Sequence, residues 1–545
     1  MTTTRCEVAV VGSGFAGSLL ARILTRLGYD VMLLERDTHP RFAIGESSTP
    51  MANLTLDRLG ARYGLPDCHD LAAHGRWLAR RPQLMRGLKR GFTYYRHHPG
   101  TPFADRGKQT ERLLVAASPD DAISDMHWLR ADVDYHFVLE AIAAGVTYRD
   151  RVELTGVTFD ASGARLAGTT PDGDIDVHAR FVVDASGPGG FLARQLGIPS
   201  ALDRTETRAA LVYGHFDGVG LMEQLFPNLP AGPYREDRAA VHHLIDEGWM
   251  YSLRFDDGVT SAGFLLSPRG ADSVGPDAEA RRAPTMWRAL LDRYPTLATL
   301  FADARPLFPL RLQARIQHRL ARATGERWAM LPHAYAFVDP LFSTGIAWGL
   351  RGVERLALAF EDAAHGGRLP SDAMLARYDR LLAAEADQID RLVASAYDAM
   401  ADFDMFAAHA MIYFAIVSYG EAQQGLSPGE SWAWSGFLGV GDPVSDHLLA
   451  ESRRRLKRMF GSGTRTVTAD ERREYVDWVA AAIAPRNIAG LADPARHNLY
   501  PVDLDVLLNQ HALLGLSRDD LAARLPLLRG APPSSAAGSR AADEG

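Results

Sequence analysis

The 545-residue chain has little cysteine. Cys6 and Cys68 are its two cysteines, and they stand far apart in the sequence. A disulfide framework needs several closely spaced cysteines, and a zinc site needs clustered ligands. The adjacent His97 and His98 point in different directions and precede a Pro-Gly pair, so we expect a solvated turn there. The sequence therefore predicts no disulfide scaffold and no metal site, and it favours a cytoplasmic location.

Positive charge is scarce relative to negative charge. The sequence holds 59 Lys and Arg against 67 Asp and Glu, a formal net charge of −8. A protein that binds DNA or RNA concentrates positive charge to neutralise phosphates. We therefore expect no nucleic-acid partner.

Long apolar runs are missing as well. The most apolar stretch, residues 406–419, contains His409 and Ser418, and it is shorter than the roughly 20 residues that a membrane-spanning helix needs. Residues 1–5 lack the build of a signal peptide. The sequence predicts no transmembrane segment and a buried helix over residues 406–419. With 47% hydrophobic and 23% charged residues, the composition is that of a globular protein.

One motif near the N-terminus has the spacing of a dinucleotide-binding site. An apolar strand over residues 7–11 leads into Gly-Ser-Gly-Phe-Ala-Gly at residues 12–17, and a helix pattern follows over residues 18–27. A second strand over residues 31–34 ends at Glu35, about twenty residues past the glycines, where the fingerprint places an acid. A glycine turn without a ligand would not require all these parts in this order.

Each part of the motif has a physical task. Gly12 permits the tight turn, Gly14 lets the backbone approach a diphosphate, and Gly17 lets the helix and strand pack closely. The helix start around Ala16 attracts phosphates through its free N–H groups and its dipole. Glu35 can accept a hydrogen bond from a ribose hydroxyl. We therefore expect a bound dinucleotide.

Further segments carry a second set of signals. Residues 45–50 read Gly-Glu-Ser-Ser-Thr-Pro, and residues 87–92 read Gly-Leu-Lys-Arg-Gly-Phe. Residues 180–187 form a strand pattern that ends in a small-residue turn with an acid, and residues 337–345 have the form FxxPxxSxG before a helical pattern. With these motifs the chain resembles the flavin-dependent halogenases, the tryptophan-halogenase-like branch of the FAD-dependent monooxygenase superfamily. The resemblance extends from about residue 7 into the four-hundreds.

The resemblance implies a non-covalently bound FAD and a set of residues that hold it. These are Gly12, Gly14, Ala16, Gly17, Glu35, Arg36, Ser47, Arg130, Asp184, Ser186, Gly187, Asp339, Pro340, Gly345 and Ile346. An ion pair of Arg130 with Asp132 or Asp134 at a helix start would explain those three residues nearly as well. No convincing second GxGxxG follows, which fits a protein that receives reduced FAD from a separate flavin reductase, as this family does.

The resemblance also implies a halide site and a catalytic lysine. Backbone N–H groups of Thr344 and Gly345, in the turn opened by Ser343, would help to hold chloride or bromide near the flavin. Lys89 would orient the resulting hypohalous acid by a hydrogen bond or capture it as a haloamine. Composition alone favours another interpretation of Lys89, a solvated residue in the basic stretch 86–90.

The sequence departs from the family at residues 249–254. The family motif WxWxIP, thought to separate substrate from flavin, retains only Trp249, because Tyr251, Leu253 and Arg254 replace its other members. A tyrosine keeps much of an aromatic wall, whereas an arginine adds charge and a fork of donors. The motif therefore predicts either an altered wall or a shift to hydroxylation or dehydrogenation.

The substrate class is indicated by Phe342. Tryptophan-specific members carry a glutamate at this position, and members that act on phenols and pyrroles carry phenylalanine. The sequence thus favours a phenolic, pyrrolic or polyketide-like aromatic, free or bound to a carrier protein. Trp432 and Trp434, in a loop-like region, are candidates to cap its site.

The predicted fold class is α/β. It comprises a Rossmann-like FAD-binding lobe of the three-layer ββα type (residues 1–200 and 305–375), an antiparallel substrate sheet (201–304), a mainly helical C-terminal region (376–530) and a disordered tail (531–545). The leading hypothesis is a halogenase of an aromatic natural-product precursor. A flavin hydroxylase or dehydrogenase on the same scaffold is the alternative, and a flavoprotein without catalysis is a third.

Overall fold

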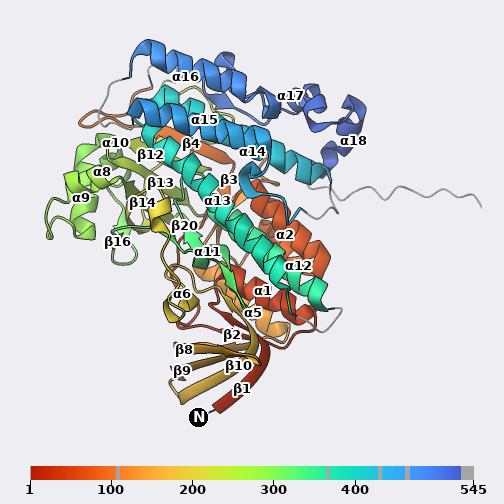
Figure 1. The fold of residues 1–545 in the computed structure, drawn as a ribbon. Coiled ribbons are helices and arrows are strands. Elements are labelled where there is room, and N and C mark those ends of the chain that lie inside the picture. The colour runs from red at the N-terminus through yellow and green to blue at the C-terminus, as the bar shows by residue number, and fades with distance from the viewer. Residues whose placement is uncertain (1, 106–110, 365–368, 428–431, 461–466, 529–545) are drawn as a thin grey trace, which may run out of the picture.

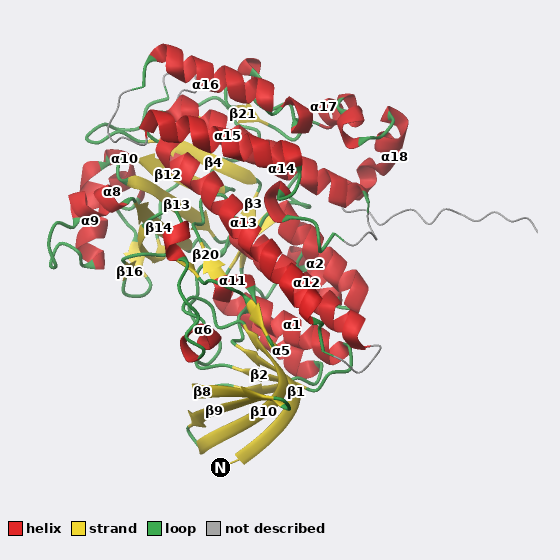
Figure 2. Ribbon diagram, in the orientation of Figure 1, coloured by secondary structure: helices red, strands yellow, loops and turns green. Residues whose placement is uncertain are grey.

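The computed structural model describes residues 2–105, 111–364, 369–427, 432–460 and 467–528. The predicted tail, residues 531–545, lies outside the described residues. The fold is α/β, as expected. One sheet lies near the N-terminus, a second sheet lies further along the molecule, and long helices run between and beyond them (Figures 1 and 2).

The first sheet has the strand order β18-β19-β10-β1-β2-β7, and β9 and β8 extend it from β10. Its strands are β1 (Thr2–Val11), β2 (Val31–Leu34), β7 (Thr147–Arg149), β8 (Glu153–Asp160), β9 (Gly163–Thr170), β10 (Gly173–Asp184), β18 (Thr324–Gly325) and β19 (Trp328–Met330). β1 pairs in parallel with both β2 and β10. Because the loops after parallel strands gather at one edge, the glycine turn after β1 lies beside the end of β10.

The predicted local elements of this lobe are confirmed. The strand expected over residues 7–11 is the end of β1, the helix expected over residues 18–27 is α1 (Phe15–Arg26), and the second strand has its predicted bounds. α1 starts three residues earlier than its apolar pattern because the glycine turn leads directly into it.

The second sheet has nine strands in the order β15-β11-β14-β13-β12-β4-β5-β21, with β16 also on β11. They are β4 (Gly91–Arg96), β5 (Arg112–Ala116), β11 (Ala210–Asp217), β12 (Ala240–Ile245), β13 (Gly248–Arg254), β14 (Thr260–Leu266), β15 (Arg305–Pro306), β16 (Arg311–Gln313) and β21 (Leu499–Tyr500). Five of these strands lie outside residues 201–304, and β12 pairs with β4 in parallel. The sheet therefore contains parallel as well as antiparallel pairs, because strands distant in sequence join it.

The remaining strands form two small pairs. β3 (Arg86–Lys89) pairs with β6 (Asp125–Trp128), and β17 (His318–Arg319) pairs with β20 (Ala336–Phe337). In the first pair, Lys89 lies directly opposite Asp125.

The helices before residue 344 are mostly short. After α1 they are α2 (Pro50–Tyr63), α3 (Pro66–Asp70), α4 (His74–Arg80), α5 (Arg130–Ala143), α6 (Phe191–Gln195), α7 (Met222–Leu225), α8 (Pro268–Val274), α9 (Ala283–Arg293), α10 (Pro295–Leu300) and α11 (Pro332–Tyr335). α1 packs against α5 and against the long helix α12 (Thr344–Ala364).

The C-terminal region is mainly helical, as the sequence predicts. It contains α13 (Asp372–Ala399), α14 (Phe403–Leu426), α15 (Pro443–Phe460), α16 (Ala469–Ala482), α17 (Leu504–Asn509) and α18 (Arg518–Leu528). α14 includes the apolar residues 406–419. It is long and apolar enough to cross a membrane by length and composition, but 72% of its most apolar window is buried against the rest of the protein. A buried helix is therefore confirmed there.

Candidate active site

Two cavities meet near the start of α12. The first has a volume of about 390 Å³ and lies between the start of α1, residues 41–47, the strand β13 and the segment that leads into α12. Many of the residues predicted from the sequence line it: Gly14, Ala16, Gly17, Ser47, Arg130, Ser186, Gly187, Trp249, Tyr251, Pro340, Ser343, Gly345 and Ile346. Segments distant in sequence thus converge on one space.

The glycines at the start of α1 shape the turn and keep the N-terminus of the helix uncovered. A Cβ atom on Gly12 (φ +102°) would lie 2.5 Å from the carbonyl oxygen of Ala185, and one on Gly17 would lie 2.1 Å from the carbonyl oxygen of Gly12. These two positions therefore need glycine for the turn and for close packing. A Cβ on Gly14 would meet nothing nearer than side-chain atoms at 3.7 Å, and no side chain caps α1. The helix N-terminus is thus accessible from the cavity, and this arrangement fits the diphosphate of FAD.

Glu35 stabilises the glycine turn and does not line the cavity. Its Oε2 accepts hydrogen bonds from the backbone N–H and the hydroxyl of Ser13, at 2.9 and 2.8 Å. Burial opposes its ionisation, but the charge of Arg41 and these hydrogen bonds hold the pKa of Glu35 below its usual value. The adjacent Arg36 has a side chain that is 67% exposed.

Asp184 and Asp339 were also predicted to bind FAD, but both accept hydrogen bonds from neighbouring protein groups and neither lines the cavity. Asp184 accepts hydrogen bonds from the backbone and hydroxyl of Ser186 and from the N–H of Leu192. Asp339 accepts one from the Tyr397 hydroxyl at 2.9 Å, and burial raises its pKa to about 7. The residues of the predicted FAD set that do not line the cavity are Gly12, Glu35, Arg36, Asp184 and Asp339. Contact of these residues with FAD stays a prediction.

Arg130 forms the predicted ion pair at the start of α5, and its contact with FAD stays a prediction. It forms a two-pronged ion pair with Asp134 at 2.8 and 2.9 Å, and it also donates to the carbonyl oxygens of Ile44 and Gly45. The same side chain lines the first cavity. Arg130 therefore holds the loop before Ser47 in place and leaves a positive charge at the cavity wall.

The altered motif on β13 keeps an apolar wall. Trp249, Tyr251 and Leu253 line the first cavity, and Trp249 is anchored by a hydrogen bond from its Nε1 to the Tyr397 hydroxyl at 3.1 Å. Arg254 does not line the cavity, and its guanidinium donates to the carbonyl oxygen of Val219 at 3.2 Å. The expectation that Arg254 adds charge to the wall is therefore wrong, because β13 turns that side chain away.

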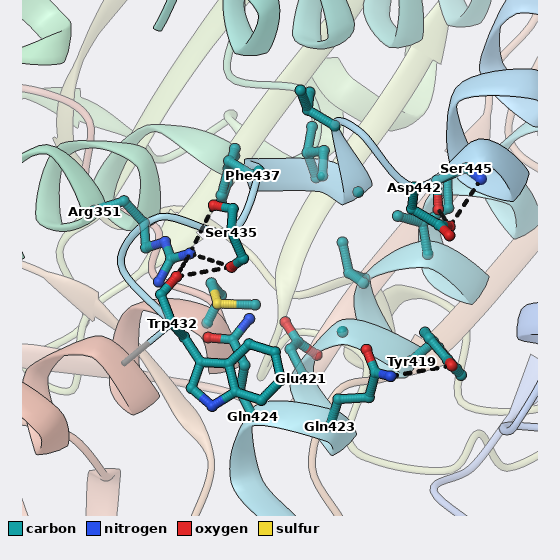
Figure 3. A pocket seen from close by; sticks show the side chains of 18 of the residues that line it. Arg351, Tyr419, Glu421, Gln423, Gln424, Trp432, Ser435, Phe437, Asp442 and Ser445 are labelled. Atoms are coloured by element: carbon teal, nitrogen blue, oxygen red, sulfur yellow. Dashed lines mark hydrogen bonds between the residues drawn. The ribbon is translucent and has the colours of Figure 1, made fainter. Parts of the chain in front are cut away.

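The second cavity has a volume of about 460 Å³ and is built mainly by α14 and by residues 432–442 (Figure 3). Its wall is aromatic and polar: Tyr413, Tyr419, Glu421, Gln423, Gln424, Trp432, Trp434 and Phe437 line it together with Arg351 and Asp442. The predicted tryptophan pair thus lines a cavity of a size suited to a small aromatic molecule.

Two short segments, residues 47–49 and 343–345, contribute side chains to both cavities and form the partition between them. Ser47 lines the first cavity and Thr49 the second. Likewise Ser343 and Gly345 line the first, whereas Thr344 between them lines the second. The Ser343 hydroxyl donates to that of Ser47 at 3.0 Å and joins the two segments. Ser343 has φ +52°, a strained value for a residue other than glycine, and such strain is concentrated at functional sites.

Lys89 is attached to this partition. Its ammonium group donates to the carbonyl oxygen of Ser48 at 2.5 Å and lies 4.1 Å from the centre of the Phe92 ring. The side chain is fully buried, so the interpretation as a solvated lysine is wrong. Burial lowers the pKa of Lys89, and the nearby carboxylates of Asp125 and Glu421 oppose that shift. The lysine is thus bonded to the segment that lines both cavities, although it lines neither cavity itself.

Phe342 lies behind the second cavity. It is buried and lines neither cavity, and its ring packs 4.6 Å from that of Tyr413, which does line the second cavity. The Tyr413 hydroxyl donates to the carbonyl oxygen of Phe342 at 2.9 Å. A direct contact of Phe342 with substrate stays a prediction.

Sequence reasoning missed several wall residues. Phe42, Tyr213 and His333 line the first cavity, and burial lowers the pKa of His333 to about 3. They come from separate segments and belong to no motif. Glu421, in the second cavity, stands at the end of an apolar helix pattern that indicates only burial.

Comparisons with known proteins agree with this geometry. The family model of tryptophan halogenase matches residues 66–406, and that of an NAD(P)-binding Rossmann-like domain matches residues 10–70. Tetracycline 7-halogenase of Kitasatospora aureofaciens is 30% identical over 63% of this chain and 60% of its own length. Monodechloroaminopyrrolnitrin halogenase PrnC of Pseudomonas fluorescens is 27% identical over 74% of this chain and 69% of its own.

A solved structure extends the likeness to most of the fold. The halogenase PltM, in complex with phloroglucinol and FAD, has a TM-score of 0.81 and 23% identity, and the match covers 91% of this chain and 99% of PltM. That likeness concerns the fold, whereas the tryptophan halogenase model spans more than half of the sequence. The chain therefore belongs to the tryptophan halogenase family.

Proposed function

We propose that the protein is a flavin-dependent halogenase of a phenolic aromatic substrate. The observation that carries the proposal is the partition between the two cavities, with Lys89 buried against it. A halogenase must keep its substrate away from the cofactor and still pass a small oxidant to it. Two cavities that share residues 47–49 and 343–345 as a common wall meet that requirement.

The chain's own residues have distinct tasks in this proposal. The glycine turn and the start of α1 hold the FAD diphosphate, and Trp249 and Tyr251 form part of the wall of the same cavity. When bound and reduced by a separate flavin reductase, FAD supplies the activation of oxygen that converts chloride or bromide to hypohalous acid. Backbone N–H groups of Thr344 and Gly345 hold the halide at the partition.

Lys89 guides the halogenating species on the substrate side. Its ammonium group has donors beyond the one bound to Ser48, and a buried cation orients a small polar oxidant strongly because little water competes. The second cavity presents aromatic walls to a flat ring. Phloroglucinol, the ligand of the similar PltM structure, is a phenol, and this supports a phenolic substrate for this chain.

The alternative of a hydroxylase or dehydrogenase rests on the altered segment 249–254. One of its changes, Arg254, adds no charge to the wall, because Arg254 does not line the first cavity and donates to Val219. The other changed residues, Tyr251 and Leu253, line the first cavity together with Trp249 and keep an aromatic and apolar wall there.

The test uses purified protein with FAD, a generic flavin reductase, NADH and chloride or bromide. A panel of phenols, resorcinols and pyrroles is supplied, and products are read by mass spectrometry. We expect a halogen isotope pattern that falls by about 10²–10⁴-fold in Lys89→Met, in line with the loss of one proton-transferring or orienting group. Lys457→Met, at a lysine that is 61% exposed, should retain activity.

Titration with FAD separates binding from chemistry, and Lys89→Met should bind FAD like the wild type because Lys89 does not line the first cavity. Product that gains one oxygen and no halogen would contradict the proposal and favour a hydroxylase. Equal halogenation by wild type and Lys89→Met would remove the lysine from the reaction.

A further inference from the structure

The second cavity contains a carboxyl group that the proposed reaction has not used. Glu421 stands on the C-terminal half of α14 and lines the cavity, and Figure 3 shows its carboxyl group among the side chains that surround the space. Gln423 and Gln424 lie beside it on the same helix, and Trp432 lies on the facing segment. A ring held in this cavity would lie against that carboxyl group.

Several other polar side chains of the wall are bound to the protein. Asp442 forms an ion pair with Arg486 at 2.6 Å, and Gln424 accepts a hydrogen bond from Arg58 at 3.1 Å. Arg351 donates to the carbonyl oxygen and the hydroxyl of Ser435. Glu421 accepts a backbone N–H from Met51 at the start of α2, and within the described ranges it forms no ion pair with an arginine, lysine or histidine.

Charges from neighbouring elements set the state of Glu421. The charges of Asp125 on β6 and Lys89 on β3 act on it, and Arg351, Asp442 and Arg486 lie elsewhere on the cavity wall. Burial raises the pKa of Glu421 well above its usual value, the charge of Asp125 raises it further, and Lys89 opposes the rise. A carboxylate with a raised pKa is a stronger base near neutral pH than an exposed glutamate.

We propose that Glu421 is the catalytic base that removes the proton of the substrate's phenolic hydroxyl during halogenation. The proposal rests on the proposed function, which supplies hypohalous acid, and it narrows the substrate to rings with a free hydroxyl. The geometry that carries it is one carboxyl group without an arginine partner inside the aromatic cavity.

The proton and electron balance is complete with these groups. Glu421 takes the phenolic proton, and a carbon of the electron-rich ring attacks the halogen of hypohalous acid. The oxygen–halogen bond breaks, and its electron pair leaves as hydroxide, which takes the proton lost from the same ring carbon and becomes water. The proton on Glu421 then returns to the product oxygen. The phenol and hypohalous acid thus give the halophenol and water.

The experiment compares two substrates in matched variants. Resorcinol has hydroxyl protons, and 1,3-dimethoxybenzene has the same ring without them. We expect Glu421→Gln to lower kcat/KM for resorcinol by about 10²–10⁴-fold, and to leave the slower reaction of the dimethyl ether unchanged. Glu474→Gln, the same substitution at a side chain that is 77% exposed, should match the wild type on both substrates.

A pH profile distinguishes a base from a structural residue. With resorcinol, wild-type kcat/KM should fall as the pH drops through the pKa of Glu421, and this limb should be absent in Glu421→Gln and restored in part in Glu421→Asp. Any change of kcat/KM with pH that arises from Lys89 and Asp125 should persist in every variant. With 1,3-dimethoxybenzene as the substrate, kcat/KM should not fall at the pKa of Glu421 in the wild type or in any variant.

The possible outcomes distinguish a failure of the Glu421 proposal from a failure of the proposed halogenase function. If the wild type halogenates resorcinol and Glu421→Gln keeps both rate and acid limb, Glu421 is not the base and halogenation stands. If the wild type gives no halogenated product while FAD binds, the proposed function fails first. Equal losses on resorcinol and on the ether would assign Glu421 a structural role and overturn the proposal.

Discussion

Among single residues, glycines decide whether a cofactor can enter the first cavity. Gly12 and Gly14 differ in their surroundings: a Cβ on Gly12 would overlap backbone atoms, whereas one on Gly14 would come no closer than 3.7 Å to the side chains of Arg130 and Asp134. A side chain at residue 14 would occupy the place of the diphosphate without disturbing the turn. We expect Gly14→Val to weaken FAD binding about 10–100-fold, because an overlap of one or two methyl groups costs about 1–3 kcal/mol. Fluorescence titration with FAD measures the change.

The matched control is Gly156→Val on β8, where a Cβ would meet no atom within 4 Å. It should bind FAD normally. A thermal midpoint of Gly14→Val well below that of Gly156→Val without FAD would mean that residue 14 serves the fold rather than the cofactor.

At the scale of elements, α12 and α13 fix the wall of the second cavity. Arg355 on α12 and Glu385 on α13 form a fully buried ion pair. Arg355 also donates to the carbonyl oxygen of Ala433 at 2.7 Å, and Glu385 accepts the N–H of Phe437 at 2.7 Å. The pair therefore holds both ends of the segment that carries Trp434.

Removing one partner should damage both stability and substrate binding. We expect Arg355→Met to lower the free energy of unfolding by about 3–5 kcal/mol, because Glu385 would stay buried without its cation. The KM of the aromatic substrate should rise, since the segment over the cavity loses its anchors, while FAD affinity stays the same. Chemical denaturation and steady-state kinetics measure these effects. Arg454→Met, at a surface pair, should change neither, and an unchanged KM in Arg355→Met would contradict the anchoring role.

Across the whole molecule, buried histidines make the fold sensitive to acid. Burial lowers the pKa of His127, His242, His243 and His333 to about 3, and it lowers that of His97 well below its usual 6.5. In the unfolded chain these imidazoles take up protons below about pH 6.5, whereas the folded protein resists protonation until about pH 3. Their contribution to stability is therefore complete above pH 6.5 and is lost as the pH falls toward 3.

We expect the thermal midpoint to drop steeply between pH 6.5 and 5, since each such histidine lowers the free energy of unfolding by roughly 2 kcal/mol at pH 5. Scanning calorimetry across this range checks the effect. His243→Asn, which can keep the hydrogen bond to His97, should flatten the dependence, and His178→Asn at an exposed position should not. A midpoint independent of pH in the wild type would contradict the prediction.

Several features were predictable from local sequence. The order of strand, glycine turn, helix and second strand at residues 7–35 is confirmed, because backbone sterics and hydrophobic pattern act over short distances. The resemblance in residues 45–50, 87–92 and 337–345 predicted the family. Lys89 was named from its position in a motif, but its burial was not evident from a stretch rich in arginine.

Other features depended on contacts between distant segments. The composition of the second sheet was incomplete in the prediction, because β4, β5 and β21 join it through pairings that no local pattern specifies. His97, expected in a solvated turn, is buried against His243 at 2.9 Å, since β12 carries that histidine to it. Arg254 belongs to a wall motif in sequence and lies outside the wall in space.

The sequence by itself determined the dinucleotide fold, the family and the identity of the glycines, the lysine and the Ser-Thr-Gly turn, because these depend on residue type and short spacing. The tertiary structure alone decided that Ser47–Thr49 and Ser343–Gly345 form one partition, that Lys89 is bound to it, and that Glu421 faces the cavity beyond. The hydrogen bond between Ser343 and Ser47 joins residues 296 positions apart in the chain. Only the packing of α12 and α14 against the loops from both lobes brings such residues together.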